Sequence, residues 1–130
     1  MGEAAYITGL QHVGIPTNDL EATIAFYTSL GFEVALRTGN PKADEQVCFL
    51  TLGNLCIETY ENGCAVGKPG AVDHIALNVT DIEGAFREAK RAGRTLLDQE
   101  VQFLPFWEKG VRFFTILGPN GEKVEFCQKL

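Results

Sequence analysis

Two stretches of the chain, 10–16 and 72–79, alternate apolar residues with polar or small ones, which predicts a strand in each. Apolar residues then recur every three or four positions, which predicts a helix after each strand. The recurring positions are Leu20, Ile24, Tyr27 and Leu30 in the first helix and Ile82, Phe86, Ala89 and Gly93 in the second. The pattern therefore opens twice in the same way, with a strand followed by a helix.

Both predicted helices begin with residues that favour an N-cap. Each start offers two capping residues and then a glutamate: Asn18, Asp19 and Glu21 in the first helix, and Thr80, Asp81 and Glu83 in the second. Each glutamate lies three residues beyond the first of the two caps, which is the spacing of a capping box. We therefore expect both glutamates to cap helices.

Three more strand-like stretches follow each helix. They are 32–38, 46–52 and 55–60 in the first half, and 95–104, 111–117 and 123–128 in the second. The Gly-Asn pair at 53–54 and the Gly-Pro-Asn-Gly tetrapeptide at 118–121 are typical of hairpin turns, because Gly and Asn tolerate positive φ. Together these elements predict an α+β fold.

The two halves are also similar residue by residue. Residues 10–22 align without a gap with 72–84, so that His12 matches His74, and each half ends in a strand that carries one glutamate, Glu58 or Glu125. The repeat predicts one domain, 1–130, made of a first βαβββ module at 7–60, a Gly-rich linker at 61–71 and a second βαβββ module at 72–128.

Composition narrows the class of protein. The chain has 130 residues, 45% of them hydrophobic, which is enough for one globular domain. It has no run of ~18 apolar residues and no basic, signal-like start, so we expect a cytoplasmic protein that neither spans a membrane nor is secreted. The net charge of −6 and the absence of a basic run argue against nucleic-acid binding. The expected partner is a small molecule.

His12 and His74 are the only histidines in the chain, and they occupy equivalent repeat positions. On each strand the larger aliphatic residues alternate with the histidine, so each imidazole is expected on the face opposite the helix. Glu58 and Glu125 likewise alternate with apolar neighbours. Two imidazoles and two carboxylates suit a divalent cation, and we favour a metal site over solvated strand residues.

These residues stand within motifs that resemble the vicinal oxygen chelate superfamily, and within it glyoxalase I. The motifs are the His-Val-Gly-Ile opening at 12–15, the Asp-Leu-Glu-x-x-x-x-Phe-Tyr helix at 19–27 with Leu-Gly-Phe at 30–32, Asp-His-Ile-Ala-Leu at 73–77, and Gly-Pro-Asn-Gly before Val-Glu-Phe at 118–126. The resemblance runs from about residue 7 to 128. It implies two βαβββ modules whose sheets form a cleft around a metal.

By that resemblance, the metal ligands are His12, Glu58, His74 and Glu125, holding one divalent ion (Ni, Zn, Co, Mn or Fe). The implied activity is that of a lactoylglutathione lyase, which serves in methylglyoxal detoxification. Such an enzyme moves a proton between adjacent carbons of the hemithioacetal of a 2-oxoaldehyde and a thiol such as glutathione, through an enediolate stabilised by the metal. Glu125 is the expected base, with Glu58 as its counterpart.

Two positions bear on the thiol. Bacterial glyoxalase I commonly has an Arg four residues after its first His, where this chain has Pro16. Asn62 matches a family position implicated in glutathione contact, although an Asn in a linker often serves only a turn. A thiol other than glutathione, or a substrate that is no thiol adduct, therefore stays open.

The stretch 103–114 is aromatic and has no counterpart in the first half. Phe106 and Trp107 follow Pro105 in a predicted loop, and we expect them to line a small-molecule pocket or to cover a dimer interface. Phe113 or Phe114 is expected in the core. Arg112 is a candidate partner for a substrate anion, with a solvent-facing position as the alternative.

Other members of the superfamily offer alternative functions. An epimerase of the methylmalonyl-CoA type uses the same fold and proton transfer, although the Gly-rich stretch expected late in that family is missing. A bleomycin-resistance-like protein would bind a ligand without a metal. A thiol transferase and an extradiol dioxygenase fit the four-ligand set less well.

The resemblance also implies a homodimer with sites at the subunit interface. In compact glyoxalase I, the first module of one chain pairs with the second module of another. Pairing of the two modules within one chain is the alternative.

Overall fold

The computed structural model describes residues 2–117, 119 and 122–130. The hairpin turn expected at 118–121 lies outside the described residues except for Pro119. The chain divides into two compact units. We call His12–Asp73 the first unit, and the N-terminal segment up to Gln11 together with His74–Leu130 the second unit.

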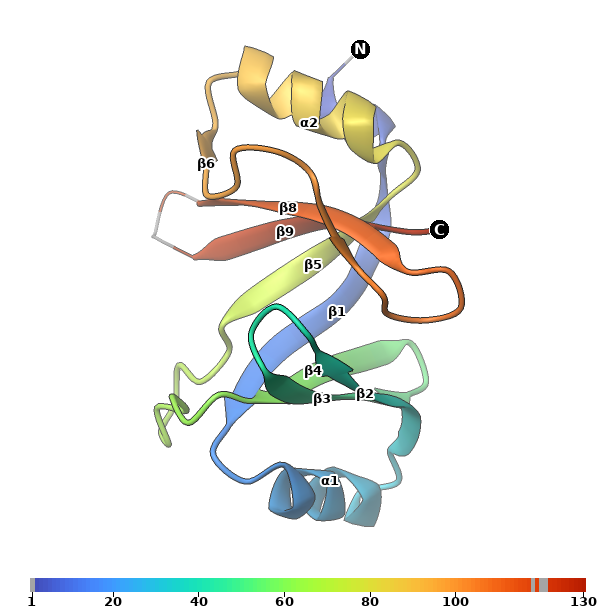
Figure 1. Cartoon of the computed structure of the whole chain (residues 1–130), viewed down its shortest axis with the longest axis vertical. Coiled ribbons are helices and arrows are strands. Elements are labelled where there is room, and N and C mark those ends of the chain that lie inside the picture. Colours follow the sequence, from blue (N-terminus) through green and yellow to red (C-terminus); the bar gives the residue numbers. More distant parts are fainter. Residues whose placement is uncertain (1, 118, 120–121) are drawn as a thin grey trace. The chain divides into compact units, whose positions relative to one another are not determined.

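The first unit is a four-stranded sheet with one helix. It contains β1 (Ile7–Thr17) from His12 onward, α1 (Leu20–Ser29), β2 (Glu33–Asn40), β3 (Glu45–Leu52) and β4 (Leu55–Glu61). The strand order is β2-β3-β4-β1, with β1 parallel to β4 and the other pairs antiparallel. Figure 1 shows α1 along one face of this sheet.

Alternation along the strands sorts the residues of the first unit onto two faces. The core against α1 contains Leu20, Phe32, Cys48, Leu50 and Ile57, with Ile15, Ile24, Tyr27 and Leu55 packed around it. Because Ile15 and Ile57 face α1, residues of the opposite parity on β1 and β4, which include His12 and Glu58, lie on the other face of the sheet.

The second unit repeats this plan. It contains η1 (Glu3–Ala5), the start of β1, β5 (His74–Val79), α2 (Ile82–Arg91), β6 (Thr95–Leu96), β7 (Gln102–Leu104), β8 (Val111–Leu117) and β9 (Lys123–Lys129). The strand order is β5-β9-β8-β6, with β5 parallel to β9 and β7 paired with β8. The observed elements are those of an α+β fold, as the sequence predicts.

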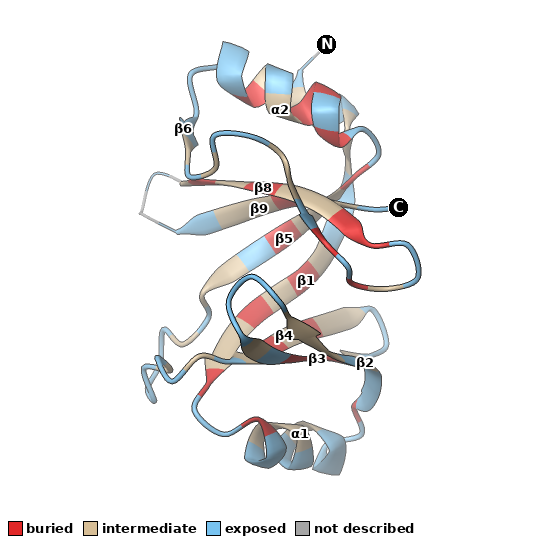
Figure 2. Ribbon diagram, in the orientation of Figure 1, coloured by how far each residue is buried: buried red, intermediate tan, exposed pale blue. Residues whose placement is uncertain are grey.

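The helix α2 buries one side against its sheet, and its buried positions recur along that side (Figure 2). The core of this unit contains Val79, Ile82, Ala85, Ala89, Phe114, Ile116 and Phe126. Phe114 stacks on Phe126 with ring centroids 4.8 Å apart, which confirms the expected core position of an aromatic residue in this stretch. None of the described helices is long and apolar enough to cross a bilayer.

In both units the last long strand also caps the helix. The side chain of Glu61 accepts a hydrogen bond from the backbone N–H of Leu20 at 2.8 Å, and that of Gln128 accepts one from Ile82 at 2.9 Å. Each capping residue lies three positions after Glu58 or Glu125. An odd separation puts the two side chains on opposite faces of the strand, so the cap lies on the helix side and the candidate ligand on the other.

Two local predictions are wrong. The helices are capped by Asp19 and Asp81, whose side chains accept from Ala22 and Gly84, so each following glutamate stands one position too early for a capping box. Glu21 and Glu83 instead form ion pairs with Arg37 and Arg112.

The second error concerns the strand predicted at 95–104, which is two short strands, β6 and β7. Between them the side chain of Asp98 accepts a hydrogen bond from the backbone N–H of Thr115 at 2.8 Å. The side chain of Asp98 thus bonds to a backbone N–H of β8 that would otherwise pair with the carbonyl of a neighbouring strand. The strand pairing is interrupted there.

Candidate metal and substrate site

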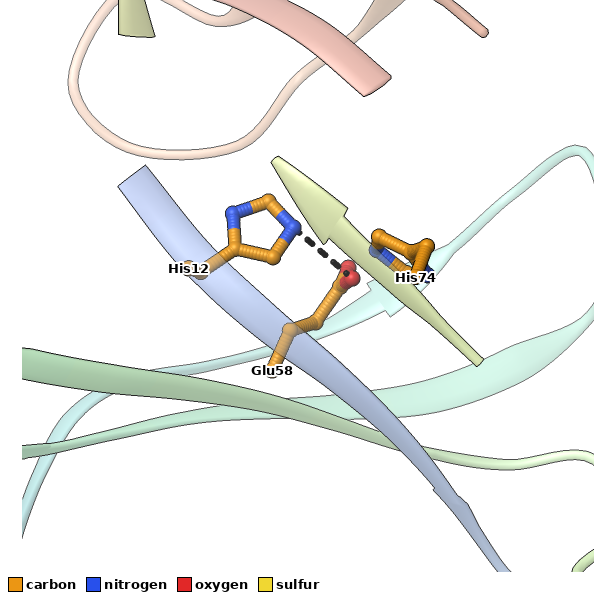
Figure 3. Close-up of side chains that lie close together, drawn as sticks. All are labelled: His12, Glu58 and His74. Carbon is orange, nitrogen blue, oxygen red and sulfur yellow. Dashed lines mark ion pairs between the residues drawn. The ribbon is translucent and has the colours of Figure 1, made fainter. Parts of the chain in front are cut away.

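The first unit brings His12 and Glu58 together. His12 on β1 and Glu58 on β4 come from parallel neighbouring strands, and their Nε2 and Oε1 atoms are 3.3 Å apart (Figure 3). Their side chains are only 4% and 13% exposed, so the carboxylate is largely removed from water and requires a partner. The imidazole also meets the ring of Phe49 edge-on at 5.5 Å, which helps to fix its orientation. His74, also drawn in Figure 3, belongs to the second unit.

The second unit brings His74 and Glu125 together in the equivalent way. Their strands, β5 and β9, are again parallel neighbours, and Nε2 and Oε1 are 3.6 Å apart. The side chains are 10% and 15% exposed. Each unit therefore holds one imidazole beside one carboxylate, both largely shielded from water.

These donor sets suit a divalent transition metal. Ligand atoms at ~2.1 Å from one ion, at right angles to each other, are separated by about 3 Å, so within each pair the two atoms are spaced for binding to one ion. Mixed imidazole and carboxylate ligation suits Ni, Zn, Co, Mn or Fe better than Mg or Ca. The residues present therefore fit the metal that the fold family implies.

Glu45 is a candidate functional residue that the sequence pattern missed. It stands at the start of β3 with the same parity as Phe49, whose register partner on β4 is Glu58. Burial, and then the charge of Glu58, raise the pKa of the Glu45 carboxyl above its usual range. Glu45 has no equivalent in the repeat, but counting back from Phe49 in steps of two would have placed it on this face.

Tyr60 lies on the same face as Glu58, between Pro16 on β1 and Val47 on β3. Burial and a hydrogen bond with the side chain of Asp73 raise the pKa of its hydroxyl, so Tyr60 stays a neutral phenol. The position where glyoxalase I commonly has an Arg, Pro16 in this chain, is therefore flanked by a phenol.

Two predicted substrate contacts have partners within the chain. The side chain of Asn62 accepts a hydrogen bond from the backbone N–H of Cys64 at 2.9 Å, forming an Asx turn, and the backbone N–H of Asn62 donates to the carbonyl of Thr17. Arg112 pairs with Glu83 on the α2 side of the second sheet, the face opposite Glu125.

The aromatic pair of the 105–110 loop separates into two environments. Phe106 is buried, whereas Trp107 is half-buried, has φ +64° and lies with its ring under the ammonium of Lys129. Phe106 is therefore enclosed by the protein, whereas part of the Trp107 side chain faces solvent.

The family model of the Glyoxalase/Bleomycin resistance protein/Dioxygenase superfamily matches residues 9–126, and the chain belongs to this superfamily. Among curated relatives, the uncharacterized protein YwbC of Bacillus subtilis is 31% identical over 127 residues, which cover 92% of this chain and 97% of that protein. The mitochondrial methylmalonyl-CoA epimerase of Homo sapiens is 30% identical over 103 residues, covering 72% of this chain and 58% of that protein.

A solved structure of similar fold is the methylmalonyl-CoA epimerase of Mycobacterium tuberculosis. It has a TM-score of 0.81 and 21% identity, and covers 96% of this chain and 90% of that one. The superfamily expected from the motifs is thus confirmed. The finer identification with glyoxalase I is not supported, since the curated relative with a named activity is a methylmalonyl-CoA epimerase.

Proposed function

We propose that this protein is a metal-dependent epimerase that acts at the carbon next to the carbonyl of an acyl thioester. The single observation that carries the proposal is the largely buried His–Glu pair present in each unit, with the two atoms 3.3 Å apart in the first unit and 3.6 Å apart in the second. The similarity to the human epimerase supports this reaction class over the hemithioacetal chemistry of glyoxalase I. Both reactions begin by removing a proton beside a carbonyl.

The proposed ligands are His12, Glu58, His74 and Glu125, with both pairs holding one ion. A divalent ion held by these donors would polarise the substrate carbonyl and so acidify the neighbouring C–H bond. Because the two carboxylates together balance the charge of the ion, the pairs are better suited to a metal than to an anionic ligand.

Epimerisation requires a proton to leave one face of the carbon and another proton to arrive at the opposite face. Two acid–base groups are therefore needed. We assign one role to Glu125, the base indicated by the resemblance, and the other to Glu45. The raised pKa of Glu45 favours the protonated carboxyl that a proton donor requires, and Glu45 lies on the same sheet face as His12 and Glu58.

The test follows deuterium uptake at the carbon next to the thioester, with methylmalonyl-CoA as the probe in heavy water and the metal content measured in every sample. We expect exchange with the wild-type protein. Glu45→Gln and Glu125→Gln should each slow the interconversion of the two epimers, followed in the same samples, by ~10²–10⁴-fold, because either change leaves one face of the carbon without its acid–base group. Glu45→Gln should retain the full metal content, and Glu33→Gln, an exposed carboxyl on β2, serves as the matched control with unchanged exchange.

Methylglyoxal with glutathione is the competing probe. Efficient isomerisation of that adduct, with no deuterium uptake into acyl thioesters, would return the assignment to glyoxalase I. Metal-loaded protein that turns over neither substrate would favour a ligand-binding protein. A His74→Ala variant that still binds one equivalent of metal with wild-type affinity would contradict the ligand assignment.

A further inference from the structure

Over its described residues, the chain passes from one unit to the other at two places, and each lies directly before a histidine. Gln11 ends the N-terminal segment of the second unit and His12 begins the first unit, whereas Asp73 ends the first unit and His74 resumes the second. Residues 10–22 align with 72–84, so Gln11 and Asp73 occupy equivalent positions in the repeat. Two equivalent polar residues thus precede the two proposed imidazole ligands.

Gln11 is held to two strands of the second unit. Its side-chain amide donates to Oδ1 of Asn78 on β5 at 2.7 Å and to the backbone carbonyl of Cys127 on β9 at 3.2 Å. Gln11 and Asn78 are half-buried, so their hydrogen bond is partly protected from competing water. Cys127 lies two positions after Glu125. The residue before His12 is therefore bonded to the strand that carries a proposed carboxylate ligand.

Asp73 is held to two strands of the first unit in a similar way. Its backbone N–H donates to the carbonyl of Gly14 on β1 at 2.7 Å, and its carboxylate accepts a hydrogen bond from the phenol of Tyr60 on β4. Tyr60 lies two positions after Glu58. The residue before His74 is therefore bonded to the strand that carries the other proposed carboxylate ligand. We call the bonds of Gln11 and the bonds of Asp73 the two clamps.

The second clamp follows a stretch of chain with considerable conformational freedom. Residues 66–70 are all exposed, and Gly67 and Gly70 have φ of +68° and +97°. A glycine backbone loses more conformational freedom on ordering than that of any other residue. Asp73 is bonded to the first unit three residues after Gly70, and His74 comes next. The backbone of His74 is thus anchored by its immediate neighbour.

We infer that Gln11 and Asp73 are positioning residues of the metal site. Each clamp restricts the backbone of the histidine that follows it, so the imidazole is oriented before an ion binds and less conformational entropy is lost on binding. The inference rests on the proposed function, since it takes His12 and His74 as metal ligands. Neither Gln11 nor Asp73 is itself a ligand in this account.

The test measures zinc affinity by competition with a chromophoric chelator, which requires no turnover. Gln11→Ala and Asp73→Ala should each weaken zinc binding about tenfold, the usual scale for groups that orient metal ligands. Asp73→Asn retains an oxygen that accepts from Tyr60 and should keep most of the affinity. The visible absorption of the cobalt-loaded protein should change in both alanine variants, because it reports the geometry of the ligands.

Matched controls remove comparable hydrogen bonds elsewhere in each unit. Gln128→Ala removes a glutamine that bonds to Ile82 and Thr80 on the helix side of the second unit. Asn18→Ala removes the acceptor for the backbone N–H of Ala65 in the linker at 3.1 Å. Both controls should bind zinc with wild-type affinity and give the wild-type cobalt spectrum, even where they lower the unfolding temperature.

A double-mutant cycle identifies the bond responsible in the second clamp. Tyr60→Phe removes only the hydroxyl and should weaken zinc binding as Asp73→Ala does. The double variant should be no weaker than either single variant, because all three lack the same bond. Wild-type affinity in both Gln11→Ala and Asp73→Ala would overturn the inference. An equal loss in the two control variants would also overturn it, because any loss of stability would then weaken the metal site.

This inference and the proposed function fail differently. Zinc affinity that depends on the clamps, in a protein that gives no deuterium uptake into acyl thioesters, would leave the clamps standing and remove the epimerase. Deuterium uptake by wild type, with wild-type zinc affinity in the clamp variants, would leave the epimerase standing and remove the positioning role.

Discussion

Thr59 on β4 is fully buried, and its Oγ1 is the buried side-chain polar atom without a hydrogen-bond partner among the described residues. It shares its face with Ile57, in the core against α1. A hydroxyl buried without a partner costs the free energy of its lost hydration, typically about 1–3 kcal/mol.

Thr59→Val should therefore stabilise the protein. Valine has the same branched shape and lacks the hydroxyl, so we expect about 1 kcal/mol more free energy of unfolding and a Tm higher by roughly 4 °C. Thr17→Val is the control, because the hydroxyl of Thr17 bonds with Thr23 at 2.8 Å and with the backbone of Asp19. Urea unfolding should show the two substitutions acting in opposite directions, and destabilisation by Thr59→Val would contradict this account.

Glu45 makes the stability of the metal-free protein depend on pH. Its pKa is raised in the folded state, so the folded protein binds more protons than the unfolded chain as the pH rises above 4.5. The free energy of unfolding therefore falls as the pH rises from the pKa of Glu45 in the unfolded chain through its pKa in the folded protein. Above the folded-state pKa this destabilisation is fully present. Below pH 4 the carboxyl is protonated in both states and the cost disappears.

Glu45→Gln removes this cost. In the presence of chelator we expect the variant to unfold at higher urea concentration than wild type at pH 7, and the difference to shrink toward zero at pH 4. The same variant is expected to lose epimerisation, so stability and activity should change in opposite directions. A stability difference independent of pH would show that the titration of Glu45 is not its source.

At the scale of elements, the two faces of β4 and of β9 carry residues with different roles. One face carries Glu58 or Glu125, and the other carries the residue that caps the helix of the same unit, Glu61 or Gln128. Gln128 also donates to the backbone carbonyl of Thr80 at 3.1 Å, so its side chain bonds to the residues on either side of Asp81, the N-cap of α2. The helix start and the ligand strand are thereby held together.

Gln128→Ala should destabilise the second unit by about 1 kcal/mol, because the N–H of Ile82 and the carbonyl of Thr80 lose a partner. Metal content should stay at the wild-type level, since Glu125 points to the opposite face of β9. Thermal unfolding and elemental analysis on the same preparation measure both effects. Gln128→Glu, which retains the acceptor for Ile82, should recover part of the loss.

At the scale of the whole molecule, we expect a homodimer in which the first module of one chain completes a site with the second module of its partner. Mixing His12→Ala with Glu125→Gln subunits tests this. Exchanged pairing puts both lesions into one site of the heterodimer and leaves the other site intact, so activity should reappear after subunit exchange. Recovery no greater than the sum of the two parents, with exchange demonstrated, would indicate that each site forms within one chain.

The motifs identify the superfamily, but they do not distinguish between the reactions that its members catalyse. His12, His74, Glu58 and Glu125 indicated the superfamily correctly, but the narrower step to glyoxalase I went beyond what they carry. A metal that acidifies a C–H bond beside a carbonyl serves both reactions. We therefore expect side chains outside the repeat, such as Glu45 and Tyr60, to determine the choice of substrate.

The sequence by itself determined the order of the elements, the internal repeat and the types of residue in each His–Glu pair. These follow from local periods of two and 3.6 residues and from the alignment of one half on the other. The predicted boundaries of 111–117 agree with β8, whereas β1, predicted at 10–16, begins three residues earlier at Ile7. The pattern failed at 95–104, where the hydrogen bond from Asp98 to β8 decides the structure.

Only the tertiary structure decided which residues meet. The pairing of His12 with Glu58 depends on β1 lying parallel to β4, and the position of Glu45 depends on the register of β3. Arg112 was a candidate for a substrate anion until α2 brought Glu83 to it. Trp107 has a left-handed backbone in a loop whose Gly110 accepts a hydrogen bond from the backbone N–H of Leu130. Strand order, register and loop strain arise from contacts between residues far apart in the chain, and no local period encodes them.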